Sequence, residues 1–310
     1  MKITKVELLW SRACPYRCAG CAMPLDNPDH QGTIKQWQQG VRRMRELGSQ
    51  FVAIYGAEPL TRPVGLAEVI REIYAVGMKA TVITALPKSP LLRKLLNETP
   101  LDSITVSWDG TYGDEWREKK SMDGQHALHD YKDVRDRAVV ATVSHLNVDQ
   151  IVDMAKQATA EGWWFLFDLY HPGSGELSKC NNEGGLQQAS QTKVHAMAKG
   201  LLEFKRAGGK VHASEQYLEF LQTFAGSIRQ MWHCHKRATG WLTIDSDGSI
   251  MPCDDWQVKS DKKIWDEIDP VPLKDWRDDA VSKCPGCAWN THFHAVGIEE
   301  GTIPITTYVH

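Results

Sequence analysis

The sequence predicts an α/β protein built on an open, partial barrel of six strand–helix units, followed by a small cysteine-rich segment. Apolar runs with strand character alternate with segments of helical periodicity from residue 3 to about residue 213. This order implies a parallel sheet with right-handed crossovers, and six units are too few to close the eight-stranded barrel. Beyond that point the alternation stops. We therefore expect two domains, residues 1–213 and residues 214–310.

Each predicted strand is a short apolar run, and each predicted helix has apolar residues three or four positions apart. Gly48 ends the first helix, and Pro63 stands in the first turn of the second. The predicted strands are 3–10, 51–55, 80–85, 104–108, 138–144 and 163–170. The predicted helices are 33–47, 62–76, 90–97, 148–161, 187–207 and 215–224. The charged segment 111–136 predicts an irregular helical insertion with a solvated face. Residues 242–251 predict a β-hairpin that turns at Asp247-Gly248.

The composition limits the kinds of partner that the protein is expected to bind. A net charge of -3 gives no basic footprint for nucleic acid, and no apolar run approaches the roughly 20 residues of a membrane span. The eight cysteines fall largely in close groups, which favours metal binding in a reducing compartment over disulfides. We expect a cytoplasmic protein that does not contact a membrane, and its charge does not indicate a nucleic-acid partner.

Three of these cysteines, Cys14, Cys18 and Cys21, follow the first predicted strand at C-x3-C-x2-C spacing. Thiolates are soft ligands, which select zinc or iron–sulfur clusters. Zinc normally takes four protein ligands, and no fourth lies nearby in the sequence. Three thiolates on a short loop suit a [4Fe–4S] cluster with one open iron. The alternatives are a zinc knuckle and three unrelated core cysteines.

The motif, in this position, resembles the signature of the radical S-adenosylmethionine (radical SAM) superfamily. That resemblance implies a (β/α)6 partial TIM barrel whose cluster, on Cys14, Cys18 and Cys21, chelates SAM through its open iron. It further implies reductive cleavage of SAM to a 5′-deoxyadenosyl radical, which abstracts a hydrogen atom from substrate. A reducing partner such as flavodoxin or ferredoxin is also implied. Gly20 departs from the aromatic residue that family members often place before the third cysteine.

Further resemblance to the family lies at the ends of later strands. Gly56-Ala57-Glu58-Pro59 resembles the GGEP motif that receives the SAM amino group, with alanine at the second glycine. Asp109 has an alternative interpretation, as a helix cap or turn residue. Asp168, at the end of the sixth strand, points to the same carboxyl-terminal edge of the predicted sheet. The residues that the resemblance assigns to the cofactor site are Gly56, Ala57, Glu58, Pro59, Thr84, Ser107 and Asp109. His145 and Asn147, which follow the fifth strand, are added to this site from their position, with a structural role as the favoured alternative for each of them and for Asp168.

A second set of cysteines, Cys234, Cys253, Cys284 and Cys287, lies in the C-terminal segment. Four thiolates complete either a tetrahedral zinc site or a fully ligated [4Fe–4S] cluster. The spacing resembles the SPASM/twitch extension of radical SAM cores, in the shorter twitch form with one auxiliary [4Fe–4S] cluster. Cys180, outside both sets, is interpreted as a plain thiol.

Together these features predict an enzyme that completes a two-electron oxidation of a small molecule or a peptide. A cluster with four protein ligands has no open iron for substrate, so accepting an electron from the substrate radical is its natural role. A redox-neutral rearrangement of a small molecule or nucleoside is the alternative among enzymes. A zinc-stabilised binding protein without SAM chemistry is the alternative from another class.

Overall fold

The computed structural model describes residues 3–19, 21, 23, 32–63, 65–101, 103–110, 120–170, 187–225, 240–254, 256 and 258–284. Its strands are β1 (Lys5–Ser11), β2 (Phe51–Gly56), β3 (Lys79–Thr84), β4 (Ser103–Ser107), β5 (Asp136–Val143), β6 (Trp164–Leu169), β7 (Trp241–Ile244) and β8 (Ile250–Met251). Its helices are α1 (Ile34–Glu46), α2 (Leu66–Ala75), α3 (Pro90–Glu98), α5 (Lys120–Ala127), α6 (Ile151–Ala160), α7 (Gln191–Arg206), α8 (Glu215–Thr223) and α9 (Pro270–Ser282), with a 3-10 turn at Pro59–Thr61.

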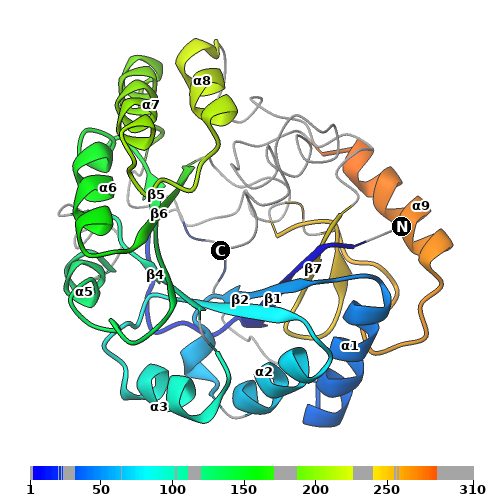
Figure 1. Cartoon of the computed structure of the whole chain (residues 1–310). Coiled ribbons are helices and arrows are strands. Elements are labelled where there is room, and N and C mark those ends of the chain that lie inside the picture. Colours follow the sequence, from blue (N-terminus) through cyan, green and yellow to red (C-terminus); the bar gives the residue numbers. More distant parts are fainter. Residues whose placement is uncertain are drawn as a thin grey trace.

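The strands form one curved sheet in the order β6-β5-β4-β3-β2-β1-β7-β8. Strands β1 to β6 pair in parallel with their sequence neighbours, and helices surround the sheet on its outer side (Figure 1). This arrangement confirms the predicted partial barrel. All the carboxyl ends of these parallel strands therefore meet at one rim, which is where barrels of this kind carry their sites.

Alternation along β1 shows how the sequence produces the two faces of the sheet. Val6, Leu8 and Trp10 belong to the buried core between sheet and helices, where α1 contributes Trp37. The Trp10 and Trp37 rings lie 5.5 Å apart between centroids. The intervening residues of β1 turn to the barrel interior, because successive strand side chains point to opposite faces. Helix α1 begins at a capping box formed by Thr33 and Gln36.

The hairpin turning at Asp247-Gly248 is confirmed, since β7 and β8 pair antiparallel and Gly248 has a φ of 81°. Its first strand also extends the barrel sheet, because β7 pairs in parallel with β1 from Lys5 opposite Trp241 to Leu8 opposite Ile244. The sheet thus continues across the predicted boundary between residues 213 and 214. That boundary itself stays a prediction.

Two segments differ from expectation. Within 111–136 the structure describes residues from 120 onward, and these pack α5 against the end of β4 as an ordinary crossover helix. A Cβ added to Gly124 would lie 2.5 Å from the Ser107 carbonyl oxygen, and Leu128 is fully buried. The segment still has the solvated face that the sequence predicts, since the described charged residues Asp130, Lys132, Asp133 and Arg135 are exposed, while a few apolar residues suffice to seat the short helix. Helix α9 was not predicted, although Asp269 caps it and Pro270 opens it.

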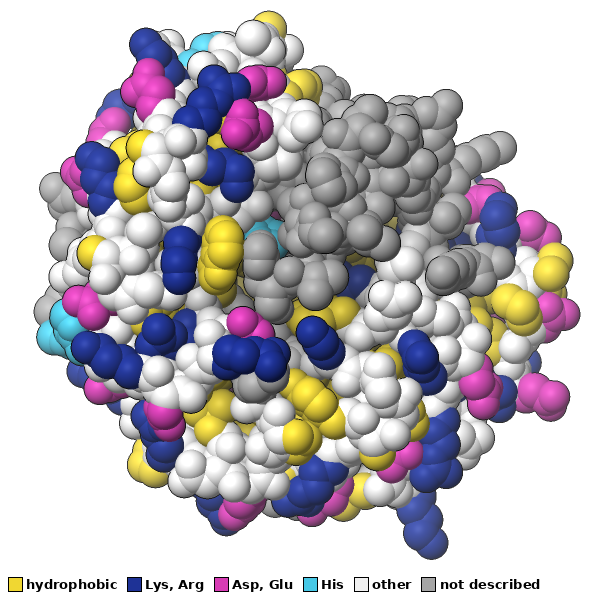
Figure 2. All heavy atoms as spheres, in the orientation of Figure 1, with side chains coloured by type: hydrophobic (Ala, Val, Ile, Leu, Met, Phe, Trp, Pro, Cys, Tyr) yellow, Lys and Arg dark blue, Asp and Glu magenta, His cyan; other side chains and the backbone are white. Residues whose placement is uncertain are grey.

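The outer surface agrees with the small net charge. On the face seen in Figure 2, dark-blue Lys and Arg are interspersed with magenta Asp and Glu over the described residues. None of the helices in the described ranges has the length and apolar character needed to cross a membrane.

Candidate functional site

The loop that carries the first cysteine set leaves the carboxyl end of β1 and is held there by the turn that follows β2. Ala57 N donates to the Ser11 carbonyl at 2.9 Å, and Glu58 N donates to the Ala13 carbonyl at 3.0 Å. Gly56 has a φ of 140°, and a Cβ on it would lie 2.4 Å from the Ser11 carbonyl oxygen. Glycine is therefore required for this contact. The turn and the cysteine loop form one unit.

Glu58 joins this unit to the end of β3. Its side chain, 1% exposed, accepts hydrogen bonds from Thr84 Oγ1 at 2.8 Å, Ala85 N at 2.8 Å and Leu60 N at 3.0 Å. A carboxylate offers about four lone-pair directions, so these three donors leave little further capacity. The side chain thus organises the rim between β2 and β3, besides facing the cavity described below.

The cysteine loop itself contains a tight turn. Cys21 N donates to the Cys18 carbonyl at 3.2 Å, and Tyr16 N donates to Cys14 Sγ at 3.4 Å. All three thiols are outside disulfides, and Cys18 is buried. Within the described ranges, no three His, Cys, Asp or Glu side chains converge as a ready metal site. The fit to a cluster therefore rests on the donor set, three soft thiols on one loop at the barrel rim.

A cavity of about 330 Å³ runs inside the barrel beneath this loop. It exists because the inward side chains midway along the strands are small, as at Ala53, Thr105 and Ala138. Cys21 and Met23 border it at the carboxyl rim, next to the turn after β2. A molecule in this space would contact the cysteine loop directly.

The structure divides the predicted cofactor residues into two groups. Those in contact with the cavity are Gly56, Ala57, Glu58, Thr84 and Ser107. Pro59 is buried in the turn behind them. Asp109, His145 and Asn147 are not among the described residues that line the cavity, whereas Asp168 is.

Asp109 and Asn147 instead fasten the ends of β4 and β5 together, and each is 3% exposed. Asp109 Oδ1 accepts from Thr142 N at 2.7 Å, and Asn147 Nδ2 donates to the Asp109 carbonyl at 2.9 Å. Asn147 Oδ1 also accepts from Ser144 N at 2.8 Å. His145 turns toward Gln187, whose backbone N donates to His145 Nδ1 at 3.1 Å. The turn-forming interpretation of Asp109 fits this geometry.

Sequence reasoning missed a polar pair on the cavity wall. Tyr55 Oη donates to Glu7 Oε2 at 2.8 Å, and Lys5 Nζ lies 3.5 Å from Glu7 Oε1. Burial raises the pKa of Tyr55 well above its usual value, and Asp254 and Glu7 beside it raise it further. The phenol therefore stays neutral and remains a donor. A glutamate inside the otherwise apolar run 6–10 was the available signal.

The second cysteine set is described in part. Cys253 follows β8, and Cys284 follows α9. Trp256 links the segment after β8 to α9, because its Nε1 donates to the Ala280 carbonyl at 2.9 Å. Trp256 N also donates to Cys253 Sγ at 3.1 Å. Asp254, next to Cys253, lines the same cavity as Cys21. Cys234 and Cys287, like Cys180 and Gly20, lie outside the described residues.

Several solved structures have a fold similar to that of this chain. SuiB of Streptococcus suis, bound to S-adenosylmethionine, is 15% identical with a TM-score of 0.66, covering 90% of this chain and 66% of its own. SuiB bound to precursor peptide SuiA is 13% identical, with a TM-score of 0.66 and coverage of 94% and 72%. Native anSMEcpe with bound AdoMet and Cp18Cys peptide is 14% identical, with a TM-score of 0.61 and coverage of 92% and 82%.

This chain thus spans 66% of the length of the SuiB chain bound to S-adenosylmethionine. At such identities the likeness establishes the fold. The sequence itself adds a second comparison, because the model of the radical SAM superfamily matches residues 8–161, from β1 through α6. This segment, which contains the three-cysteine loop and the turn after β2, is similar to the radical SAM superfamily.

Proposed function

We propose that the protein oxidises a small molecule or a peptide by two electrons, using SAM at the first cysteine set and an auxiliary cluster at the second. One observation carries the proposal: a single cavity is bordered by Cys21 of the first set and by Asp254, the chain neighbour of Cys253. A substrate in that cavity would lie between the two sets. The peptides named with SuiB and anSMEcpe favour a peptide as the substrate.

In this proposal Cys14, Cys18 and Cys21 hold a [4Fe–4S] cluster with one open iron, and Cys234, Cys253, Cys284 and Cys287 hold a fully ligated one. When bound, these groups and SAM supply cleavage of SAM, hydrogen-atom abstraction and removal of the remaining electron. The polypeptide itself positions the cysteine loop and the substrate. The turn at 56–58 fixes the cysteine loop, and the walls of the cavity hold the substrate between the two sets.

The first test concerns the SAM site. After anaerobic reconstitution, replacing Cys14, Cys18 and Cys21 together with alanine should remove about four irons and abolish 5′-deoxyadenosine formation. Cys180→Ala is the matched control and should keep both. Reductive cleavage of SAM by the triple variant would contradict the assignment.

The second test separates oxidation from the alternatives. Wild-type protein should hold about eight irons, and replacing Cys284 and Cys287 with alanine should leave SAM cleavage largely intact while oxidised product is lost. A product that is an isomer of the substrate, formed by both proteins, would favour a redox-neutral rearrangement. Zinc in the native second set, with unfolding of the C-terminal segment when its ligands are removed, would favour a structural site.

A further inference from the structure

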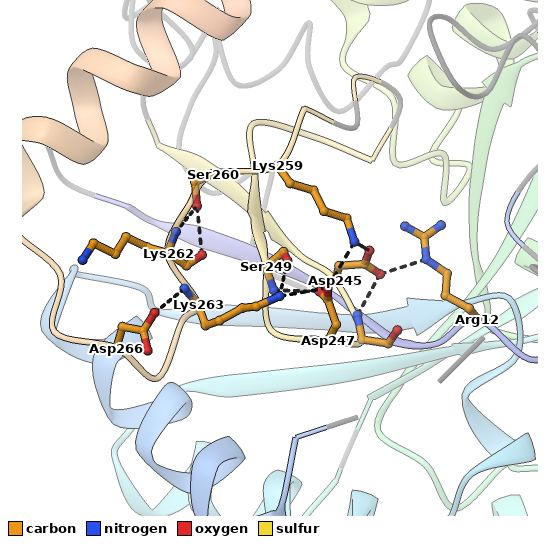
Figure 3. A network of polar contacts seen from close by, with 10 residues as sticks. Arg12, Asp245, Asp247, Ser249, Lys259, Ser260, Lys262, Lys263 and Asp266 are labelled. Carbon is orange, nitrogen blue, oxygen red and sulfur yellow. Dashed lines mark hydrogen bonds and ion pairs between the residues drawn. The ribbon is translucent and has the colours of Figure 1, made fainter. Parts of the chain in front are cut away.

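A buried ion pair connects the cysteine loop to the hairpin that precedes Cys253. Arg12 lies between β1 and Cys14, and its Nε is 2.8 Å from Asp245 Oδ1 (Figure 3). The side chains of the two residues are 3% and 4% exposed. Asp245 directly follows β7, so the contact spans 233 positions of the sequence. Neither residue was identified from the sequence, since neither belongs to a motif.

The guanidinium of Arg12 also reaches the far end of the same loop. Its second arm donates from Nη1 to Met23 Sδ at 3.6 Å, two residues beyond Cys21. One side chain thus contacts the residue that leaves the loop and the hairpin that leads to Cys253. A planar fork with several donors suits this double contact, whereas a lysine ammonium on a flexible stem does not.

Asp245 is held from its other side by the hairpin. Ser246 N donates to Oδ1 at 2.8 Å, and Lys259 Nζ lies 2.7 Å from Oδ2. Burial alone would raise the pKa of Asp245, but hydrogen bonding and charge attraction from Arg12, and then from Lys259, lower it. The carboxylate is therefore charged and fixed in orientation at neutral pH.

The rest of the network lies toward the surface. Asp247 lies 3.3 Å from Lys259 and 2.9 Å from Lys263, whose side chains are 44% and 37% exposed. Exposed pairs of this kind contribute little to stability. Figure 3 shows Arg12 on one side of Asp245 and the lysines on the other. The buried and the exposed pairs therefore occupy opposite ends of one network.

We propose that Arg12 and Asp245 are positioning residues that set the spacing between the first cysteine set and Cys253 across the cavity. A buried ion pair is a poor source of net stability, because desolvation offsets the attraction, but it defines one geometry sharply. The reason for fixing this spacing rests on the proposed function, in which an electron passes from one side of the cavity to the other.

The test begins with the apo protein, which needs no cluster. Hydrogen exchange is measured on peptides covering residues 12–23 in wild type, in Asp245→Asn and in the matched control Asp247→Asn. Asp245→Asn should speed exchange roughly tenfold or more, because a buried guanidinium loses its charged partner. Asp247→Asn should change it by less than about twofold. Equal exchange in the two variants would overturn the proposal.

The second readout is the magnetic interaction between the two reduced clusters, followed by electron paramagnetic resonance in reconstituted protein. It depends steeply on distance, so Asp245→Asn should alter it while Asp247→Asn leaves it unchanged. If Asp245→Asn does not fold, Arg12→Lys, which keeps both charges, is compared with Arg12→Met. Lysine, which keeps the charge but loses the fork, should retain only part of the wild-type interaction, and methionine should retain less than lysine. An unchanged interaction in all these variants would overturn the spacing role.

These outcomes separate the two proposals. Wild-type protein that never cleaves SAM, or that holds zinc in its second set, contradicts the proposed function. In that case the exchange comparison on apo protein alone decides whether Arg12 and Asp245 hold the loop.

Discussion

The rim of the barrel has two halves that look alike in sequence and differ in structure. On the β2–β3 half, Gly56, Glu58 and Thr84 face the cavity beside Cys21. On the β4–β5 half, Asp109 and Asn147 are turned into the backbone that joins the two strands. Both halves place polar residues after parallel strands, where a site is expected. The difference teaches that position at a strand end predicts proximity to the mouth of the barrel, while hydrogen bonding decides which side chains reach it.

The largest expected effect is a loss of stability, caused by a substitution at the closest contact of the β2–β3 half. Gly56→Ala should destabilise the apo protein by about 3 kcal/mol, because the backbone is left-handed there and the new Cβ meets the Ser11 carbonyl. Gly77→Ala is the matched control, with a φ of 77° and no heavy atom within 4 Å. It should cost about 1 kcal/mol. Denaturant titration measures both, and equal losses would show that the approach to Ser11 is unimportant.

A second experiment compares the carboxylates of the two halves. Glu58→Gln should weaken SAM binding by roughly tenfold or more at unchanged iron content. The amide NH2 of glutamine would face one of the backbone N–H groups from which Glu58 now accepts a hydrogen bond, which would disturb the part of the rim that faces the cavity. Asp109→Asn can still present an oxygen to Thr142 N, so it should change SAM affinity by less than about threefold. Calorimetric titration with SAM decides. Comparable losses in both variants would place Asp109 in the cofactor site.

The third prediction sharpens the interpretation of the β4–β5 half as structural. Asn147→Ala should lower the free energy of unfolding by about 2 kcal/mol, since Ser144 N loses its buried acceptor. Its SAM affinity should match that of wild type once the folded fraction is taken into account. Weaker binding in a variant of unchanged stability would reverse the interpretation.

The smallest effect concerns pH. Binding to Arg12 lowers the pKa of Asp245 against the opposing effect of burial. A carboxyl group whose pKa is lower in the folded state contributes stability above its unfolded pKa of about 3.9, and this contribution is lost as pH falls through the folded value. The stability difference between wild type and Asp245→Asn should thus be constant from neutral pH to about pH 4 and shrink below it. A difference that grows in acid would contradict the charged pair.

The sequence alone determined the alternation of strands and helices, the hairpin at Asp247-Gly248 and the placement of the first cysteine set after β1. These features depend on local periodicity, turn chemistry and spacing, which are written in consecutive residues. Only the tertiary structure decided that β7 joins β1, that α5 is seated against β4, and that Arg12 meets Asp245. It also decided that Glu58 faces the cavity and Asn147 does not. Such outcomes depend on contacts between residues far apart in the chain, where packing and burial choose each partner, and no local pattern records that choice.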